Sequence, residues 1–187
     1  YASDPDAGQT LTYSILSGNI NNAFGINAAS GSIFVASTIA LNFESTPSFN
    51  LVVRVQDNGT ASLSNQATIT ITLINVNEPP LIEDQIFSVI QFAAINTQVG
   101  TVLAIDPDAG QTRSFSIISG NTSNAFSINS ASGIITVSNS SALNYLTNMI
   151  FNLYVRVTDN GIGNLYSTAE ITIDILNPNH SPLISNQ

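Results

Sequence analysis

The stretch Phe49-Asn-Leu-Val-Val-Arg-Val-Gln56 places apolar side chains at positions 49, 51, 53 and 55. Polar side chains occupy positions 50, 54 and 56, so the pattern has a period of two residues. The same pattern returns in Phe151-Asn-Leu-Tyr-Val-Arg-Val-Thr158. A period of two in a run rich in valine and phenylalanine indicates a half-buried β-strand. The sequence therefore predicts a strand at each of these two places.

The two stretches belong to a long internal repeat. Residues 1–85 reappear as residues 103–187 without a gap, and 46 of these 85 aligned positions are identical. The heptapeptide Asp4-Pro-Asp-Ala-Gly-Gln-Thr10 returns unchanged as Asp106–Thr112. A period of this length suits one small autonomous domain, since domains cluster at about 100–150 residues. The chain is therefore predicted to be built from copies of one module.

Within the second copy the sequence predicts about seven strands, because short apolar stretches alternate with turn signals and no stretch carries a helical apolar stripe. These strands fall at 86–90, 101–105, 113–118, 126–129, 134–138, 150–158 and 166–176. Seven short strands in a module of about 100 residues are typical of a Greek-key β-sandwich. The predicted fold is all-β, with tandem immunoglobulin-like sandwiches in a linear array.

The copies do not coincide with the ends of the sequence. Residues 1–78 form a first copy that lacks the counterpart of residues 86–102, and with it two strands. Residues 79–180 form a complete copy, and residues 181–187 match the start of that copy. We expect the natural chain to continue on both sides, since a sandwich without two strands would expose its core and its edges.

The composition excludes several classes of partner. The chain has no cysteine, three basic residues and a net charge of −9, so disulfides are excluded and nucleic acid or an anionic membrane is disfavoured. No apolar run approaches the roughly 20 residues of a membrane span, so no membrane insertion is expected within this segment. The hydrophobic share of 43% is enough for two small cores. An acidic chain of this kind favours cations.

Most of the acidic side chains lie in loops or at strand ends, where carboxylates would repel one another unless a cation intervened. Calcium takes about 6–8 oxygen ligands from carboxylates, asparagine amides and backbone carbonyls. One histidine and no cysteine leave no four-ligand set for zinc. The sequence therefore predicts Ca²⁺ ligands among the following residues: Asp4, Asp6, Glu44, Asp57, Asn75, Asn77, Glu78, Asp106, Asp108 and Asp159.

Simpler roles stay open for several of these residues. An aspartate also favours turns through hydrogen bonds to its own backbone, and this applies to both Asp-Pro-Asp loops. Asp57 and Asp159 precede Asn-Gly, which is a hairpin signal. His180 has no matching acid and nucleophile for a catalytic triad, so no enzyme activity is expected.

Four motifs carry a resemblance to a known family. They are Leu41-Asn-Phe-Glu44, Asn75-Val-Asn77-Glu78-Pro79-Pro80, Ala104-Ile-Asp106-Pro-Asp108 and Thr158-Asp159-Asn160-Gly161. A fifth, Ile86–Gln91, lies where that family places its first strand. In this order the motifs resemble tandem cadherin repeats of the bacterial, cadherin-like kind. The resemblance implies extracellular arrays whose linkers bind Ca²⁺ and serve adhesion.

The resemblance also predicts that the junctions between successive copies differ in their calcium ligands. The second copy has Leu146 and His180 where the first copy has Glu44 and Glu78. The junction near Asn77 therefore keeps more acidic ligands than the junction near Asn179. Because the charge of the ligands tunes the affinity of a calcium site, the second junction is expected to bind fewer ions or to bind them more weakly.

Three functions follow as hypotheses. The first is a Ca²⁺-binding array at a cell surface or in a secreted protein, for adhesion or as a spacer, with other copies of the repeat or another surface protein as partner. The second is a homo-oligomeric subunit of an extracellular filament or surface layer, joined end to end or by strand addition. The third is an accessory module of a secreted glycan-degrading enzyme, for which Tyr154 and Tyr166 are the candidate surface aromatics.

Overall fold

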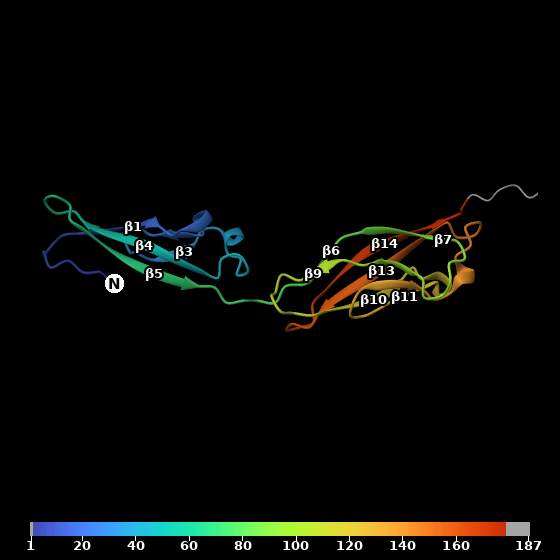
Figure 1. Ribbon diagram of the computed structural model, residues 1–187. Helices are drawn as coiled ribbons and strands as arrows, with labels where there is room; N and C mark the ends of the chain where they lie inside the picture. The colour runs from blue at the N-terminus through green and yellow to red at the C-terminus, as the bar shows by residue number, and fades with distance from the viewer. Residues whose placement is uncertain (1, 179–187) are drawn as a thin grey trace, which may run out of the picture. The chain divides into compact units, whose positions relative to one another are not determined.

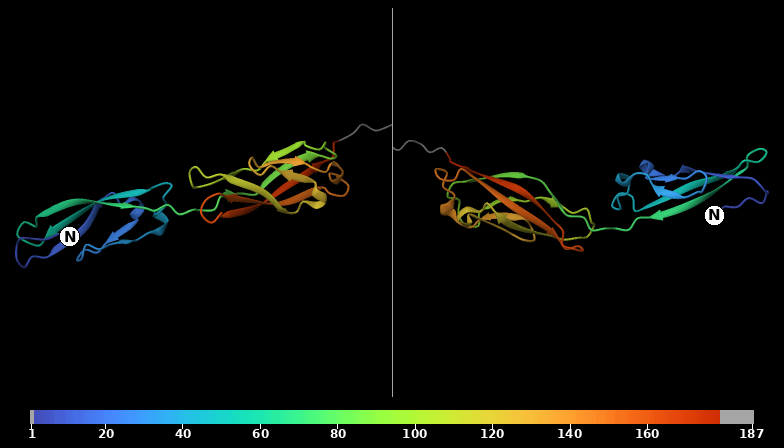
Figure 2. Two further views of the ribbon diagram at one scale, coloured as in Figure 1. Left: turned by 90° about the horizontal axis from the view of Figure 1, so that it is seen from below. Right: turned by 180° about the vertical axis from the view of Figure 1, so that it is seen from behind.

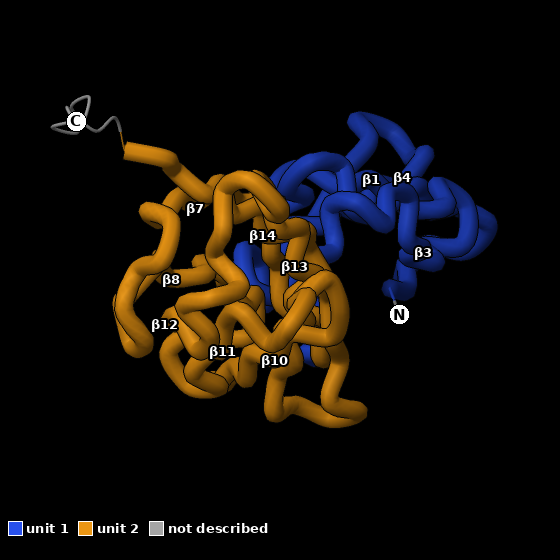
Figure 3. The backbone as a smooth tube through the Cα atoms, turned by 90° about the vertical axis from the view of Figure 1, so that its right-hand side faces the viewer, with its two compact units in different colours: residues 1–76 blue, residues 77–187 orange. Residues whose placement is uncertain are grey.

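The computed structural model describes residues 2–178 and divides the chain into two compact units (Figure 1). Unit 1 ends at Val76 and unit 2 begins at Asn77, as the two colours of Figure 3 show. The predicted start of a third repeat, at residues 181–187, and the predicted junction around Asn179 and His180 lie outside the described residues.

Unit 2 contains nine strands arranged in two main layers (Figures 1 and 2). One sheet has the order β10-β13-β14-β7, the other has the order β11-β12-β8, and β6 pairs with β9. The strands are β6 (Leu81–Ile82), β7 (Gln85–Ile90), β8 (Gln98–Thr101), β9 (Ala104–Ile105), β10 (Arg113–Ser119), β11 (Phe126–Ile128), β12 (Ile134–Val137), β13 (Ile150–Asp159) and β14 (Tyr166–Leu176).

The core of unit 2 lies between these layers. Strand β13 alternates strictly, so that Leu153, Val155 and Val157 are fully buried while Asn152 faces solvent. The rings of Phe126 and Phe151 meet edge to face, with centroids 5.2 Å apart, and so join the two layers. Strand β7 runs parallel to β14 and closes the sheet on that side. The predicted all-β, immunoglobulin-like sandwich is confirmed.

In one region of unit 2 the structure has more strands than the sequence predicts. The strand expected at 101–105 is two strands, β8 and β9, which belong to different sheets. The chain changes partner at Leu103, whose backbone N–H donates to Gln85 Oε1 at 2.9 Å instead of to a neighbouring strand. Strand β6 follows two prolines and is only two residues long, so no periodic pattern could indicate it.

Unit 1 repeats the arrangement with fewer strands. They are β1 (Leu11–Ser17), β2 (Phe24–Ile26), β3 (Ile33–Val35), β4 (Ser48–Asp57) and β5 (Ser64–Thr72), in sheets ordered β1-β4-β5 and β2-β3. Five buried residues form its core, namely Ala23, Phe24, Ala40, Phe49 and Leu51. The described helices of both units are three-residue 3₁₀ turns, and none of them is long and apolar enough to cross a membrane.

The exposed face of the larger sheet carries a cross-strand pair with a testable pH dependence. Tyr154 on β13 lies opposite Glu170 on β14. The hydrogen bond from the Tyr154 hydroxyl to the Glu170 carboxylate, followed by the negative charge of Glu170, raises the pKa of Tyr154. The folded protein thus holds the phenolic proton more tightly than the unfolded chain does. This contribution to stability is present below the ordinary tyrosine pKa of about 10 and is lost as the pH rises through the raised value.

Replacing Glu170 by glutamine should therefore lower the pKa of Tyr154 toward its ordinary value, because both the charge and the best acceptor are removed. A pH titration of tyrosinate absorbance measures this shift. The Tyr154→Phe variant identifies the signal of Tyr154 among the five tyrosines. An unchanged titration of Tyr154 in the glutamine variant would show that Glu170 is not the cause.

Candidate metal centre

Three segments of unit 2 bring polar side chains together at one end of its sandwich. Asn77 and Glu78 precede β6, Asp106 and Asp108 follow β9, and Asp159 is the last residue of β13. Among the described residues, Asp108 and Asp159 are the buried charged side chains, and each is only 4% exposed. Because burial of a carboxylate is costly unless its charge is compensated, these two aspartates need an explanation.

The Asp106-Pro-Asp108 loop is held by its own side chains. The backbone N–H of Asp108 donates to Asp106 Oδ1 at 3.0 Å, and the backbone N–H of Glu78 donates to Asp108 Oδ2 at 3.0 Å. Asp106 therefore stabilises the turn, but it uses only one of its two carboxylate oxygens to do so. The other oxygen, Asp106 Oδ2, is buried and has no hydrogen-bond partner among the described residues. A buried carboxylate oxygen without a donor is available as a ligand for a cation.

The end of β13 contributes a second fixed carboxylate. Asp159 Oδ1 accepts the backbone N–H of Gly161 at 3.0 Å, and Asp159 Oδ2 accepts Asn77 Nδ2 at 3.1 Å. Asn77 Nδ2 also donates to the carbonyl oxygen of Ile162, and Asn77 Oδ1 accepts Gln111 Nε2. Asn77 therefore ties the start of unit 2 to the loop after β9 and to the end of β13.

Gly161 fits tightly against Asn77. A Cβ atom at position 161 would overlap Asn77 Oδ1, so only glycine leaves room for the amide at this place. Asn160, the residue before it, holds the neighbouring loop, because its Oδ1 accepts the backbone N–H of Thr112 at 2.8 Å.

The chemistry of these donors fits a calcium ion. Glu78 and Asp108 each have a carboxylate oxygen within 4.8 Å of the other, which is the spacing of two ligands on one cation. Every candidate donor is an oxygen of a carboxylate or an amide, and calcium prefers oxygen ligands in a flexible arrangement. A cation between Glu78 and Asp108 would offset the repulsion between their carboxylates and compensate the buried charge of Asp108.

The remaining predicted ligands lie in unit 1. Asp4 Oδ1 accepts the backbone N–H of Asp6 at 2.8 Å, and Asp57 Oδ1 accepts that of Gly59 at 2.9 Å, which repeats the turns of unit 2. Asp6 is exposed where its counterpart Asp108 is buried. Glu44 is exposed in a turn that Asn42 holds through the backbone N–H of Ser45. Asn75 is also an exposed residue of unit 1, in the segment that follows β5.

Sequence reasoning assigned no role in the site to Gln111 or Gly161, although both lie against Asn77. A signal for them exists, since Gln111 belongs to the heptapeptide that returns unchanged and Gly161 to the repeated Asp-Asn-Gly. The repeat thus indicates that the two residues matter, but it does not indicate that Asn77 is their partner. Gln111, for example, lies 34 positions from Asn77 in the sequence.

The fold and this site define a chain of β-sandwich units with an acidic, oxygen-rich centre at the start of a unit. Comparison with known proteins agrees with that class. The family model described as the cadherin domain matches residues 1–74 and 85–176. Human Protocadherin Fat 1 is 34% identical over 97% of this chain, and the Drosophila melanogaster Fat-like cadherin-related tumor suppressor homolog is 31% identical over 97%. The chain spans only 4% of the length of either relative.

Solved structures show the same fold. Mouse Cadherin-23 EC22-24 is 26% identical, with a TM-score of 0.64, over 90% of this chain and 53% of that one. Human Protocadherin-24 EC1-2 has a TM-score of 0.68 at 23% identity, over 95% of this chain and 87% of that one, and so supports the fold alone. The chain belongs to the cadherin family, as the sequence motifs predict. The cadherin domain family is a non-enzymatic family of adhesion domains, which agrees with the expectation of no catalysis.

Proposed function

We propose that the chain is a calcium-binding repeat array of an extracellular adhesion protein. The observation that carries this proposal is the buried carboxylate group at the start of unit 2. Asp108 and Asp159 are 4% exposed, and Asp106 Oδ2 is buried without a donor. Without a cation this arrangement would be costly, whereas with one it becomes a site.

Within unit 2, Glu78, Asp106, Asp108 and Asp159 are the residues that would hold the ion, and Asn77 would position Asp159 through their hydrogen bond. Calcium would supply the positive charge that these carboxylates lack and would join the segment before β6 to the loop after β9. The family motifs add Glu44 and Asn75 as ligands from the preceding unit. They also give Asp4, Asp6 and Asp57 the same role in unit 1.

The module boundaries at 79–180 and the extracellular location belong to the same proposal. The support for the boundaries is that strands β6–β14 and one continuous core lie within residues 79–180. The support for the location is the family, because its related members are extracellular domains of cell-surface cadherins. The partner we propose is another chain of cadherin repeats, either a second copy or a different surface protein.

The adhesive role is tested with beads that carry the whole chain. Beads should aggregate in millimolar Ca²⁺ and disperse on addition of a chelator, because the ion is proposed to order the adhesive array. Beads that carry the chain with Asp106→Asn and Asp108→Asn serve as the matched control and should stay dispersed. If aggregation is equal with Ca²⁺ and with chelator, adhesion does not depend on the site.

The Gly161→Ala variant should weaken calcium binding without adding or removing a charge. Its new methyl group overlaps Asn77 Oδ1, so Asn77 must move and its bond to Asp159 is lost. Loss of one positioning contact is expected to weaken the affinity about 10- to 100-fold. A Ca²⁺ titration followed by tyrosine fluorescence measures the change. Gly59→Ala is the matched control in unit 1, and it should leave the affinity of the unit 2 site unchanged.

A further inference from the structure

The outer face of the larger sheet of unit 2 carries two exposed tyrosine rings. Tyr154 on β13 is 44% exposed, and Tyr166 on β14 is 57% exposed. In the register of these strands Tyr154 pairs with Glu170, and Tyr166 pairs with Thr158. Because positions two residues apart on a strand share a face, both rings and Glu170 point outward. The calcium site proposed above uses none of these side chains.

The repeat shows that these outward side chains are particular to unit 2. The first copy has Val52, Ser64 and Thr68 where the second has two tyrosines and a glutamate, at positions 154, 166 and 170. By contrast, the buried positions 153, 155, 157, 169 and 171 hold the same residues as positions 51, 53, 55, 67 and 69. The sandwich therefore keeps its core in both copies and does not require the two tyrosines.

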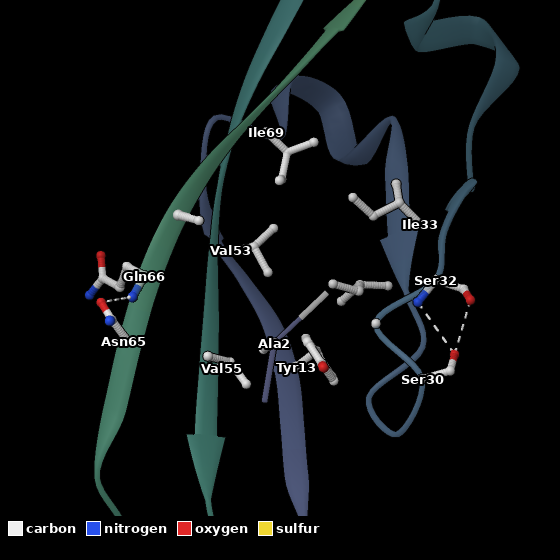
Figure 4. Close-up of a pocket in the computed structure, with 13 residues that line it drawn as sticks. Ala2, Tyr13, Ser30, Ser32, Ile33, Val53, Val55, Asn65, Gln66 and Ile69 are labelled. Atoms are coloured by element: carbon white, nitrogen blue, oxygen red, sulfur yellow. Dashed lines mark hydrogen bonds between the residues drawn. The ribbon is translucent and has the colours of Figure 1, made fainter. Parts of the chain in front are cut away.

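The corresponding face of unit 1 is equivalent in orientation. The inner side of its sheet borders an open groove of about 520 Å³ that is lined by Tyr13, Val53 and Ile69 among others. Gln66, the counterpart of Thr168, points away from this groove (Figure 4). The even-numbered positions of β5 thus face outward as those of β14 do, so unit 1 serves as an internal control without tyrosines on this face.

Each of the two rings is held by a polar neighbour. The guanidinium of Arg156 lies over the Tyr166 ring, 4.5 Å from its centroid, which is an attractive cation–π arrangement. The Tyr154 hydroxyl donates to the Glu170 carboxylate. The backbone N–H of Glu170 donates in turn to Asp84 Oδ1 at 2.8 Å, which holds β14 at this point. These contacts restrict the rings before a ligand arrives and so reduce the entropy that binding would cost.

The surface between the rings is flat and polar. Its other outward side chains are small and carry hydroxyl groups, namely Ser114, Ser116, Thr158 and Thr168. The buried centre of a protein–protein interface is usually more apolar than this. Aromatic rings beside a carboxylate and a guanidinium suit a sugar instead, because a sugar offers C–H groups on the faces of its ring and hydroxyl groups at the edge. The carboxylate accepts hydrogen bonds from hydroxyls, and the guanidinium donates to them.

Charge and spacing narrow the class of sugar. The chain has a net charge of −9, and Glu170 and Asp84 are acidic groups of this face, so an acidic polysaccharide would be repelled. Tyr166 lies opposite Thr158, which is four residues beyond Tyr154, and at about 3.4 Å per residue this is about 14 Å along the strand. A single sugar ring is too short to span this distance. The fitting ligand is therefore neutral and has several sugar units.

We propose that the outer face of the larger sheet of unit 2 binds a neutral oligosaccharide whose sugar rings stack on Tyr154 and Tyr166. Glu170 accepts and Arg156 donates hydrogen bonds to the sugar hydroxyls. Arg156 covers one side of the Tyr166 ring, and the exposed remainder of that ring receives the sugar. A β-linked glucan matches this face best, because its equatorial hydroxyls leave C–H groups on both faces of each ring. This function goes beyond calcium binding and adhesion.

The test is an NMR titration of the whole chain with cellohexaose, a neutral β-linked glucan. Because the face is open, the Kd is expected to be on the order of 1 mM. The amides of residues 154–158 and 166–170 should shift saturably, whereas those of residues 52–56 and 64–68 in unit 1 should not. Tyr166→Ala should weaken the affinity about 3- to 10-fold. The variant with both Tyr154→Ala and Tyr166→Ala should show no saturable shift, and Tyr166→Phe, which keeps the ring, should bind as the unmodified chain does.

Four results would overturn the proposal. They are an absence of saturable shifts at a cellohexaose concentration of about ten times the expected Kd, an unchanged affinity in the double alanine variant, equal affinity for glucose, and tighter binding of an oligogalacturonate of the same length. Equal affinity for glucose would show that the two rings do not act together. Tighter binding of the galacturonate would show that Arg156 receives an anion instead of a neutral sugar. The spectrum of each variant also reports whether that variant is folded.

Discussion

Calcium should raise the free energy of unfolding of unit 2 by about 2.7 kcal/mol when its concentration is 100 times the Kd. The reason is that the folded unit holds Glu78 beside Asp108, and the loop of Asp106 and the end of β13 are tied to the same segment by hydrogen bonds, whereas the unfolded chain lacks this arrangement. Replacing both Asp106 and Asp108 by asparagine should remove most of this gain. The apo protein should lose little stability, because asparagine keeps the side-chain oxygen that the turn uses.

Calorimetric melts with Ca²⁺ and with chelator measure this effect. The matched control is the chain with Asp4→Asn and Asp6→Asn, which makes the same chemical change in unit 1. This control should keep the full response of unit 2 to calcium. If the Asp106 and Asp108 variant still gains as much stability as the unmodified chain, the ion binds at other residues.

The Leu153→Ala substitution should destabilise unit 2 by about 4 kcal/mol, near the upper part of the range for buried leucine. Leu153 is fully buried on β13, within a core that both layers of the sandwich enclose. Because its neighbours are held from both sides, they can relax only partly into the cavity that the substitution leaves.

The same substitution in unit 1 is the control. Leu51 is also fully buried, but the core of unit 1 has five buried residues and an open groove beside it. Leu51→Ala should therefore cost only about 2 kcal/mol, since the surroundings can collapse more easily. Because each unit has a core of its own, chemical denaturation should show two transitions, and each substitution should shift one of them. An equal loss in both units would show that the open groove does not loosen the core of unit 1.

Much of the fold could be predicted because its signals are local. The alternation at Phe49–Gln56 and its copy indicates β4 and β13, and both strands appear within a residue or two of the expected bounds. The parallel pairing of β7 with β14 could not be predicted in the same way, because it joins Gln85 to Ile171 across the whole module. The division of 101–105 was missed because the change of partner at Leu103 depends on the Gln85 side chain.

The candidate site was predictable in its residue types and less so in its geometry. Aspartates at loops indicate oxygen ligands, and the structure brings Asp106, Asp108 and Asp159 to one end of unit 2. Their burial is a tertiary property, since it depends on contacts such as Asn77 to Asp159, which are 82 positions apart. The part played by Gln111 follows from the same contacts, and no local pattern could reveal it.

The central claim is that the buried carboxylates of unit 2 form a calcium site. Titration calorimetry of the whole chain with Ca²⁺ tests this claim most directly, with the Asp159→Asn variant measured beside it. We predict saturable binding in the range of about 10⁻⁴–10⁻³ M that is usual for extracellular modules. The affinity should fall at least about ten-fold in the variant, which corresponds to about 1.4 kcal/mol. Absence of binding at millimolar Ca²⁺, or the same affinity in the chain and in the Asp159→Asn variant, would contradict the claim.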